Sequence, residues 1–345
     1  MLPRYDGTQS YEWNYTHAPA PLGVDVPPLA GQYEFLGRPV GSPLGVAAGP
    51  LLNGAWLLYY AGLGFDVLTY KTVRTRARDC YPLPNVLPVA VEQVSGSEPH
   101  VPRASAMNGT WAVSFGMPSM PPEVWKADVR QTRELLAKDK LLSVSVVATE
   151  QPGWTITELA DDYALAARWA VESGADCVEA NFSCPNVCSS DGQLYQHPGD
   201  AARCAEAIRA AIGDVPLIIK VGHQVDEAAA LAMIDALAPS CTALSMTNSV
   251  ALPVADENGE LLFGGQRRGI CGRGIREASI AQTALMHELI RRRGYKLRLI
   301  GVGGAFDATD VRRYLAAGAE AVHLATAVMI EPDVAIGIRR AWSNA

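Results

Sequence analysis

Eight short apolar runs alternate with eight helical patterns along this chain, and this alternation restricts its fold more than any other feature of the sequence. The apolar runs have the length of strands and lie at 44–48, 66–72, 141–148, 177–182, 216–221, 243–247, 298–302 and 321–325. Apolar residues at three- and four-residue spacing predict helices over 53–62, 122–138, 155–173, 199–212, 225–237, 276–294, 307–318 and 332–343. Strands that are apolar on both faces and joined through helices predict an α/β fold, a parallel (β/α)8 TIM barrel.

An open, doubly wound parallel sheet is the alternative to a closed barrel. That fold needs a glycine-rich turn after its first strand, and the segment 47–50, Ala-Ala-Gly-Pro, matches such a turn poorly. Residues at helix ends support the predicted elements. Asp200 and Asp307 stand where N-caps are expected, and Gly174 and Gly318 stand where helices end.

Three segments fall outside the eightfold alternation. Residues 1–43 are rich in Pro, Gly, Tyr and Trp and show no clear period, so we expect an N-terminal extension along the surface of a barrel that spans 44–345. Its aromatic residues, Trp13 among them, would pack on the barrel or on a partner subunit. Insertions at 73–121 and 249–275 follow the second and sixth strands, which places them at the C-terminal rim, where barrel enzymes build their sites.

Composition argues against several classes of protein. The net charge is −7 over 345 residues, which disfavours a nucleic-acid partner. No stretch approaches the roughly 18 apolar residues of a membrane span, and the N-terminus lacks the basic start and apolar run of a signal peptide. The seven cysteines are an odd, scattered set without a Cys-x-x-Cys pair. We therefore expect a cytoplasmic protein with no disulfide framework and no metal site.

Polar side chains gather where several predicted strands end. Lys71 and Lys220 lie at the ends of apolar runs, Asn181 ends the fourth strand, and the segment 247–249, Thr-Asn-Ser, ends the sixth. Because the carboxyl ends of barrel strands meet at one rim, these side chains would form a ring around a polar or anionic ligand. For the two lysines the alternatives are a solvent-exposed strand end and an ion pair with a distant carboxylate, since neither strand carries an acidic neighbour.

Glycines follow the seventh strand and open the turn before the helix at 276–294. Gly303 and Gly304 come directly after the run at 298–302, and Gly272 lies in that turn. Glycine lets backbone N–H groups approach an anion, and the loops after strands 7 and 8 are the usual phosphate site of a β/α barrel. The sequence thus predicts a phosphate site here, with plain turn geometry as the alternative.

The segment 179–186, Glu-Ala-Asn-Phe-Ser-Cys-Pro-Asn, carries the densest set of reactive and polar groups. It places two amides, a hydroxyl and the Cys184 thiol within six positions. Inert packing is the alternative for such a thiol, because cysteine is among the most buried residue types. A catalytic role would require a thiolate, whose pKa the site has to lower or match.

Together these segments resemble the dihydroorotate dehydrogenase family, flavin mononucleotide (FMN) enzymes on a β/α barrel, over roughly residues 37–335. The most specific segments are 70–72, 181–186, 247–249 and the stretch from 269 to 326. The resemblance implies that Cys184 is the catalytic base. A Cys base is similar to the soluble branch of the family, and residues 1–43 do not look like the apolar helix pair of its membrane branch.

The resemblance also implies two sets of binding residues. The positions that match the flavin-binding set are Ala48, Lys71, Thr72, Asn181, Lys220, Thr247, Gly272, Gly303, Gly304, Ala325 and Thr326. The positions that match the substrate-binding set are Lys71, Ser114, Gly116, Met117, Asn181, Asn186, Asn248 and Ser249. One position departs from the family, because Val113 stands where an Asn usually bonds the substrate ring. The implied substrate is therefore dihydroorotate or another small dihydropyrimidine-like cyclic amide.

In the implied reaction, flavin N5 takes a hydride from one substrate carbon and Cys184 takes a proton from its neighbour. Lys220 would stabilise the negative charge on the reduced flavin, and Lys71 would face a substrate carboxylate or carbonyl. The electron acceptor stays open among fumarate, NAD through a partner subunit, a quinone and oxygen, and a homodimer is the default assembly. Two other functions fit the residues: a phosphate-binding barrel lyase or isomerase that uses Lys71 or Lys220 as a Schiff base, and a non-catalytic flavoprotein.

Overall fold

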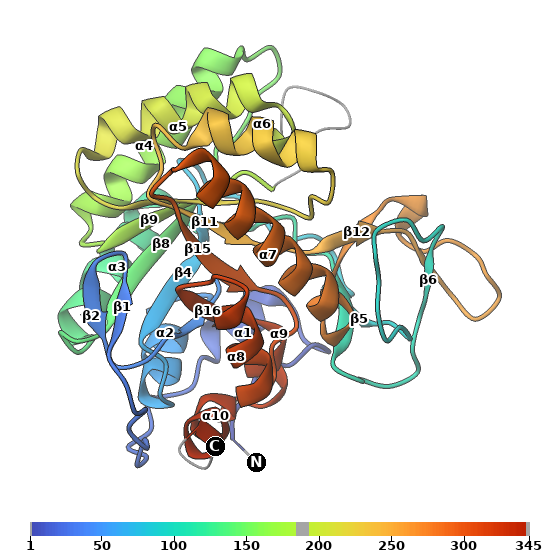
Figure 1. Cartoon of the computed structure of the whole chain (residues 1–345). Coiled ribbons are helices and arrows are strands. Elements are labelled where there is room, and N and C mark those ends of the chain that lie inside the picture. The colour runs from blue at the N-terminus through green and yellow to red at the C-terminus, as the bar shows by residue number, and fades with distance from the viewer. Residues whose placement is uncertain (1, 184–192, 343–345) are drawn as a thin grey trace.

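Eight parallel strands close into a barrel in the order β3-β4-β8-β9-β10-β11-β15-β16. The structure is a computed structural model that describes residues 2–183 and 193–342 (Figure 1). The barrel strands are β3 (Leu44–Val46), β4 (Val67–Val73), β8 (Leu141–Val146), β9 (Cys177–Asn181), β10 (Leu217–Lys220), β11 (Ala243–Met246), β15 (Arg298–Val302) and β16 (Ala321–Leu324). Each predicted apolar run overlaps one of these strands, and β4 extends one residue beyond its predicted run, so the prediction of a closed (β/α)8 barrel is confirmed and the open sheet is wrong.

Helices surround the barrel (Figure 1). They are α2 (Gly54–Gly62), α3 (Pro122–Leu135), α4 (Ile156–Glu172), α5 (Pro198–Ile212), α6 (Glu227–Leu237), α7 (Arg276–Arg293), α8 (Ala308–Ala316), α9 (Thr326–Ile330) and α10 (Val334–Trp342). Asp307 caps α8 as predicted, and Gly174 and Gly318 follow α4 and α8 with positive φ. The N-cap predicted at Asp200 is wrong, because α5 already begins at Pro198, whose fixed φ suits a first helical position.

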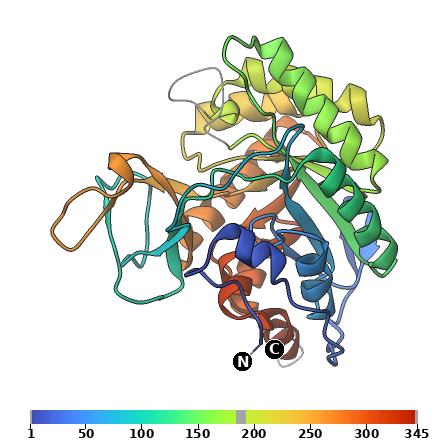
Figure 2. The same cartoon turned by 180° about the vertical axis from the view of Figure 1, so that it is seen from behind.

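The N-terminal extension contains regular elements that its aperiodic sequence does not predict. These are α1 (Tyr11–Thr16), which lies against the barrel beside β4 (Figure 2), and a hairpin of β1 (Tyr33–Phe35) and β2 (Arg38–Val40). The hairpin covers the N-terminal end of the barrel, where Phe35 is fully buried against interior residues of β4, β8 and β10. The Phe35 ring also stacks on His323 of β16, with the ring centroids 5.7 Å apart.

The two rim insertions pair with each other rather than folding separately. Strands β5 (Val86–Pro88), β6 (Val101–Pro102) and β7 (Thr110–Val113) come from the first insertion, and β12 (Val250–Leu252), β13 (Val254–Ala255) and β14 (Arg268–Gly272) from the second. They form the sheet β12-β14-β7-β5 and the pair β13-β6, which project from the end of the barrel opposite the hairpin (Figure 1). Short 3-10 turns complete the chain at Leu194–Gln196, Phe263–Gly265 and Arg273–Ile275.

The barrel interior is built in layers, and one layer corrects a sequence-based expectation. The layer next to Phe35 is apolar and contains Val67, Leu141, Cys177, Ala243 and Ala321. Side chains two residues apart on a strand share a face, so the next layer on four alternate strands consists of Thr69, Glu179, Ser245 and His323, which are at most 1% exposed. We call these four residues the polar layer.

Strands that are apolar on both faces were expected, and bulky branched residues dominate such layers in other barrels. That expectation is wrong for the polar layer. Residues that face the helices, such as Val178 and Ala180 beside Glu179, are apolar and make each run look apolar as a whole.

Candidate active site

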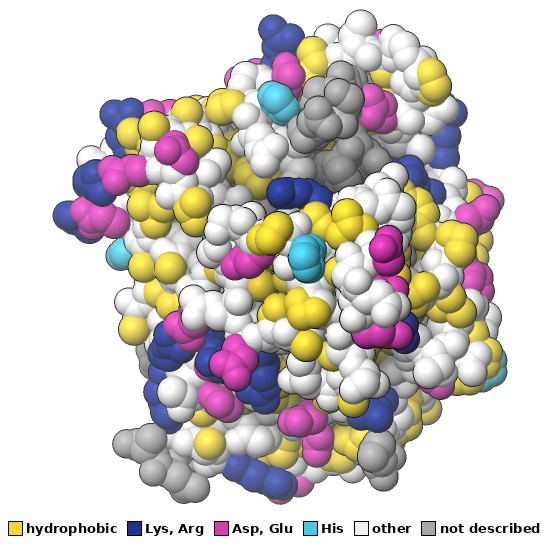
Figure 3. Space-filling model, turned by 90° about the vertical axis from the view of Figure 1, so that its right-hand side faces the viewer, with side chains coloured by type: hydrophobic (Ala, Val, Ile, Leu, Met, Phe, Trp, Pro, Cys, Tyr) yellow, Lys and Arg dark blue, Asp and Glu magenta, His cyan; other side chains and the backbone are white. Residues whose placement is uncertain are grey.

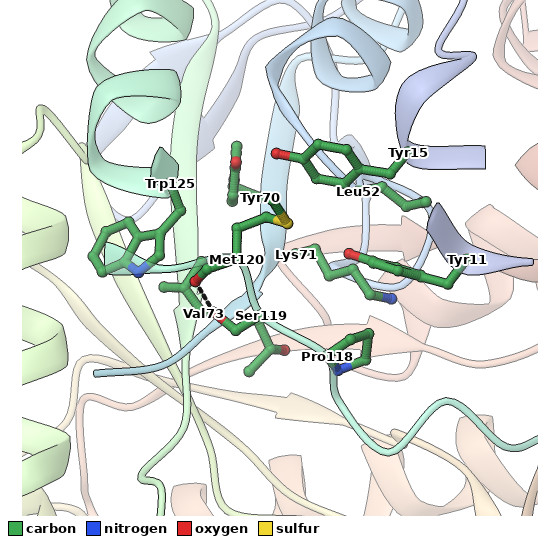
Figure 4. A pocket seen from close by; sticks show the side chains of 11 residues that line it. Tyr11, Tyr15, Leu52, Tyr70, Lys71, Val73, Pro118, Ser119, Met120 and Trp125 are labelled. Atoms are coloured by element: carbon green, nitrogen blue, oxygen red, sulfur yellow. Dashed lines mark hydrogen bonds between the residues drawn. The ribbon is translucent and has the colours of Figure 1, made fainter. Parts of the chain in front are cut away.

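Lys71 lies near the rim end of β4, with its ammonium group buried among aromatic rings (Figure 4). Its Nζ donates to the carbonyl oxygen of Gly49 at 3.0 Å and lies 5.4 Å from the ring centroid of Tyr11 and 4.8 Å from that of Phe115. Burial, with a contribution from the charge of Lys220, lowers the pKa of Lys71 to about 8. An anionic ligand beside Lys71 would favour its charged form again.

Helix α1 and the segment 118–120 cover Lys71 from the side (Figure 4). The narrow pocket between them has mostly aromatic and apolar walls, formed by Tyr11, Tyr15, Leu52, Tyr70, Met120 and Trp125. A wall of this kind keeps water away from the ammonium group and strengthens its interaction with an anion.

Lys220 ends β10 and is 5% exposed, so the alternative of a solvent-exposed strand end is wrong for this lysine, as it is for Lys71 at 8%. Its Nζ lies 3.9 Å from Oε1 of Glu179, which projects from the neighbouring strand β9. The alternative of an ion pair with a carboxylate from another segment is confirmed for Lys220, because the pairing of β9 with β10 brings Glu179 beside it. The two lysines are close enough for the charge of Lys220 to affect the pKa of Lys71.

Asn181 connects the end of β9 to the loop of the first insertion. Its Oδ1 accepts hydrogen bonds from the N–H and the hydroxyl of Ser183 at 3.2 and 2.8 Å. Its Nδ2 donates to Sδ of Met117 at 3.4 Å, and the hydroxyl of Tyr163 donates to its carbonyl oxygen at 2.9 Å. These contacts fix the amide and bring two predicted substrate-binding residues, Asn181 and Met117, into contact.

A second pocket lies where the phosphate site was predicted. It is lined by residues from the ends of β14, β15 and β16 and the loops that follow, which include Gly272, Gly303, Gly304, Ala325 and Thr326, together with Asn248. The three glycines have φ values of +93°, +134° and +71°, a region that side chains disfavour. An added Cβ at Gly272 would lie 2.0 Å from the carbonyl oxygen of Gly109, so backbone approaches backbone closely here.

Three predicted hydroxyl residues are engaged with the protein itself. Thr72 Oγ1 and Ser145 Oγ are 3.0 Å apart. The Thr247 hydroxyl donates to Oε1 of Gln282, and Ser114 Oγ accepts from Nε of Arg268 at 3.0 Å. The side chains of Thr72, Thr247 and Ser114 therefore stabilise the rim.

The remaining predicted site residues divide into two groups. Ala48 is buried in the loop after β3, Gly116 adopts a φ of +72°, and Ser249 lies so close to Gly269 that a Cβ there would be 2.5 Å from its Oγ. Cys184 and Asn186 lie outside the described residues. The structure thus brings the described members of the predicted set to one rim.

Three residues of this site are not among those that the sequence predicts for it. Tyr11 and Phe115 flank Lys71, and Glu179 approaches Lys220. A signal for Glu179 was present, because it lies two residues before Asn181 and so shares its face of the strand. No local signal connects Tyr11 with Lys71, which are joined only by the fold.

Three further observations concern the molecular surface, the helices and the candidate metal ligands. On the face that Figure 3 shows, basic and acidic side chains are interspersed. Within residues 2–183 and 193–342, no helix is long and apolar enough to cross a membrane. The same residues contain no group of three or more His, Cys, Asp or Glu side chains that could hold a metal ion.

Comparisons with known proteins agree with this geometry. A family model described as dihydroorotate dehydrogenase matches residues 32–341. A dihydroorotate dehydrogenase of Dictyostelium discoideum is 30% identical, over 99% of this chain and 97% of that protein. A dihydroorotate dehydrogenase (quinone) of Bordetella avium is 26% identical, over 88% and 82%.

A crystal structure of the enzyme from Eimeria tenella in complex with ferulenol has a TM-score of 0.75 at 16% identity and covers 96% of this chain and 89% of its own, which shows a shared fold. The match of the family model and the full-length relative go further than the fold. The chain belongs to the dihydroorotate dehydrogenase family and is an oxidoreductase of that type.

Proposed function

We propose that this chain oxidises dihydroorotate, or a closely related dihydropyrimidine, to its unsaturated form with FMN bound in the barrel mouth. The observation that carries the proposal is the presence of two buried lysines, Lys71 and Lys220, on the same rim as a glycine-lined pocket. The lysines suit an anionic, electron-rich ligand, and the glycine loops suit a phosphate. FMN would place its phosphate at the glycine loops, and a small acid bound beside the flavin would place its carboxylate near the lysines.

The residues fit FMN on two grounds. Added Cβ atoms at Gly303 and Gly304 would lie 2.3 Å from Ser279 Oγ and 2.6 Å from the carbonyl oxygen of Gly272. Only glycine fits these positions, and its exposed backbone N–H groups are suited to a phosphate. Moreover, Lys220 lies beyond hydrogen-bond range of Glu179 at 3.9 Å and retains its donors for a ligand.

On this basis we assign the cofactor site to Ala48, Lys71, Thr72, Asn181, Lys220, Thr247, Gly272, Gly303, Gly304, Ala325 and Thr326. FMN, when bound, would supply the acceptor for the hydride, which carries both electrons of the oxidation away from the substrate. Lys220 stabilises negative charge at the cofactor, as a preorganised cation in a site of low dielectric does.

The chain's own residues orient the substrate and handle its proton. Lys71 holds the substrate carboxylate, and the aromatic wall around Lys71 excludes water. Cys184, as a thiolate, takes the proton from the substrate carbon next to the one that loses hydride. The substrate ring is held by Ser114, Gly116, Met117, Asn181, Asn186, Asn248 and Ser249.

Val113 bears on the choice of substrate. Val113 lies on β7 opposite Gly269 of β14. At the position of Val113 the family usually has an asparagine, which supplies an amide to the pocket. Loss of that amide from a polar pocket costs about 1–3 kcal/mol of binding, unless the ligand lacks the matching group. Lys71 favours a substrate with a carboxylate, so dihydroorotate should reduce the flavin faster than dihydrouracil does.

The test combines a spectrum with a rate. The purified protein should show a flavin absorption band at about 450 nm, which dihydroorotate should bleach under anaerobic conditions. Cys184→Ser should retain the band and slow bleaching by about 10²–10⁴-fold, the usual contribution of a general base. Cys241→Ala is the matched control, because this buried thiol lies just before β11, and its rate should equal wild type.

Each arm has an outcome that contradicts part of the proposal. A colourless protein that takes up no FMN removes the cofactor. A stable band that no dihydropyrimidine bleaches favours a non-catalytic flavoprotein. An unchanged rate in Cys184→Ser removes that residue from the mechanism.

The acceptor and the assembly complete the proposal. A homodimer in the cytoplasm, with or without an electron-transfer subunit, is the form we expect, in keeping with the commonest oligomers and the unpaired cysteine set. Reoxidation of the bleached protein by fumarate, NAD, a quinone or oxygen identifies the acceptor. Analytical ultracentrifugation determines the number of subunits.

One observation favours a second candidate function. The lowered pKa of Lys71, about 8, is a property that imine-forming lysines share. Borohydride treatment in the presence of carbonyl substrates tests this chemistry. Covalent trapping at Lys71 in a colourless protein would support a lyase or isomerase, whereas we expect no trapping.

A further inference from the structure

The polar layer lies one step deeper in the barrel than the ring of site residues. Glu179 precedes Asn181 by two residues on β9, and in the sheet register Lys220 lies opposite Asn181 on one side and Ser245 on the other. The polar layer therefore forms the floor beneath Lys220, between the apolar layer next to Phe35 and the barrel mouth.

The polar atoms of the polar layer are buried but lack hydrogen-bond partners among the described residues. Thr69 Oγ1, Ser245 Oγ, both carboxylate oxygens of Glu179 and both ring nitrogens of His323 form no hydrogen bond with any residue that the structure describes. A buried polar group without a partner costs about 1–3 kcal/mol, and a buried charge costs more. A chain that keeps these groups needs a reason other than packing.

Glu179 makes an ionic contact with Lys220. Nζ of Lys220 and Oε1 of Glu179 are 3.9 Å apart, and their side chains are 6% and 1% exposed. His323 does not form a second ion pair with Glu179. Burial, and then the charge of Lys220, lowers the pKa of His323 to about 3 and leaves the imidazole neutral. Within the described residues, Glu179 is the sole carboxylate within salt-bridge distance of Lys220.

We propose that Glu179 is a positioning residue whose carboxylate holds the Lys220 ammonium group at the barrel axis and partly neutralises it, which lowers the midpoint potential of the flavin. This inference rests on the proposed function, since it assumes that Lys220 faces FMN. Two like charges, Lys71 and Lys220, share one buried mouth and repel each other. A carboxylate on the floor of that mouth reduces the repulsion and draws Lys220 away from Lys71.

The expected effect is a change in redox equilibrium. A cation near the flavin favours the electron-rich reduced form, and an anion behind that cation opposes this preference. Removing the negative charge while keeping the shape, as Glu179→Gln does, should therefore make flavin reduction more favourable. We expect an increase of about tenfold in the equilibrium constant of two-electron reduction, which equals about 30 mV.

The experiment measures midpoint potentials by equilibration with a reference dye. The proteins are the FMN-loaded wild type, Glu179→Gln and Lys220→Met, with the double variant that combines both changes. Cys177→Ala is the matched control, because Cys177 lies on the same strand and faces the same interior, yet carries no charge partner of Lys220. Glu179→Gln should raise the potential, Lys220→Met should lower it, and Cys177→Ala should equal wild type.

The double variant shows whether Glu179 acts through Lys220. In the Lys220→Met background the further change Glu179→Gln should shift the equilibrium less than threefold. A full tenfold shift there would mean that Glu179 acts on the flavin directly and would overturn the positioning role. A Glu179→Gln potential equal to or below wild type would overturn the inference as well.

Two outcomes separate this inference from the proposed function. If the wild type binds no FMN, the proposed function fails and this inference fails with it. If the wild type binds FMN and is bleached by dihydroorotate but the potentials do not follow the predicted order, only the inference fails. Should Glu179→Gln not retain FMN, Glu179→Asp decides, because its shorter carboxylate should still raise the potential, and an unchanged value overturns the inference.

Discussion

The ring centroid of Tyr11 lies 5.4 Å from the ammonium nitrogen of Lys71, so the N-terminal extension forms part of the wall of the candidate active site. Lys71 belongs to the second barrel strand and Tyr11 to a helix that precedes the barrel. The wall around this cation is therefore complete only when α1 is docked. Changes in the extension should alter ligand binding as well as stability.

Replacing Tyr11 tests the role of its ring. Tyr11→Leu keeps an apolar side chain but removes the cation–π contact, which contributes roughly 0.5–2 kcal/mol. Orotate should therefore bind about 2- to 30-fold more weakly. Tyr11→Phe keeps the ring and should bind orotate like wild type. Titration of the flavin absorbance with orotate provides both constants, and equal affinity for Tyr11→Leu and wild type would contradict the contact's importance.

The pKa of Lys71 predicts how orotate binding depends on pH. In the ligand-free protein this pKa is about 8, so Lys71 is protonated below pH 8 and neutral above it. An anion that requires the ammonium form should bind more weakly as pH rises through 8, and its Kd should approach a tenfold rise per pH unit. Isothermal titration from pH 6.5 to 9.5 measures this trend. Lys71→Met should bind orotate weakly at every pH without that slope, and a sloping curve in this variant would assign the titration to another group.

A substitution at Gly304 tests the proposed phosphate site. Its φ is +71°, and an added Cβ would meet the carbonyl oxygen of Gly272 at 2.6 Å. Gly304→Ala should therefore displace the loop after β15 and weaken FMN binding by at least tenfold, as measured by fluorescence recovery of released flavin. Gly337→Ala is the control, because nothing lies within 4 Å of its Cβ position in α10. That change should leave FMN binding intact and stabilise the fold by about 0.5–1 kcal/mol. FMN affinity of wild-type strength in Gly304→Ala would argue against a phosphate here.

His323 predicts part of the acid sensitivity of the fold. Burial lowers its pKa to about 3 from an ordinary value of 6.5, so between these pH values the unfolded chain binds a proton that the folded chain does not. Stability then falls as pH decreases through this window, by about 1.4 kcal/mol per pH unit. His323→Gln removes this contribution. The stability difference between wild type and variant should change by roughly 2 kcal/mol in favour of the variant between pH 6.5 and 5, as measured by urea unfolding.

Parallel pH profiles for wild type and His323→Gln would show that the buried imidazole is not the responsible group. A readout at one pH alone does not decide this point, because the substitution also changes packing against Phe35. The slope against pH isolates the titration from that packing change.

The barrel could be predicted from sequence because its signal is repeated. Eight strands and their helices each carry a local pattern, and the loss of a cap at Asp200 shifts one helix start without changing the architecture. The rim position of Lys71 and Lys220 follows from the same pattern, since residues at the ends of parallel strands converge. Within the described residues the glycine pocket also lies where the eightfold order predicts it.

Contacts that depend on pairing between distant segments could not be predicted in this way. Glu179 lies beside Lys220 because of the register between β9 and β10, and a strand considered alone does not contain that register. The polar layer was hidden because the helix-facing residues of each strand are apolar. The sequence around α1 shows no helical period, so this helix could not be predicted. Its position depends on contacts of Tyr11 with side chains far along the chain.

The shared sheet of the two insertions has a consequence for anyone who wishes to re-engineer this rim. Residues 110–113 of β7 pair one for one with 269–272 of β14, so each insertion supplies backbone hydrogen-bond partners to the other. Transferring either insertion alone into a related barrel would leave the backbone N–H and C=O groups along one edge of its sheet without partners. The two insertions must therefore be grafted together to keep this pairing.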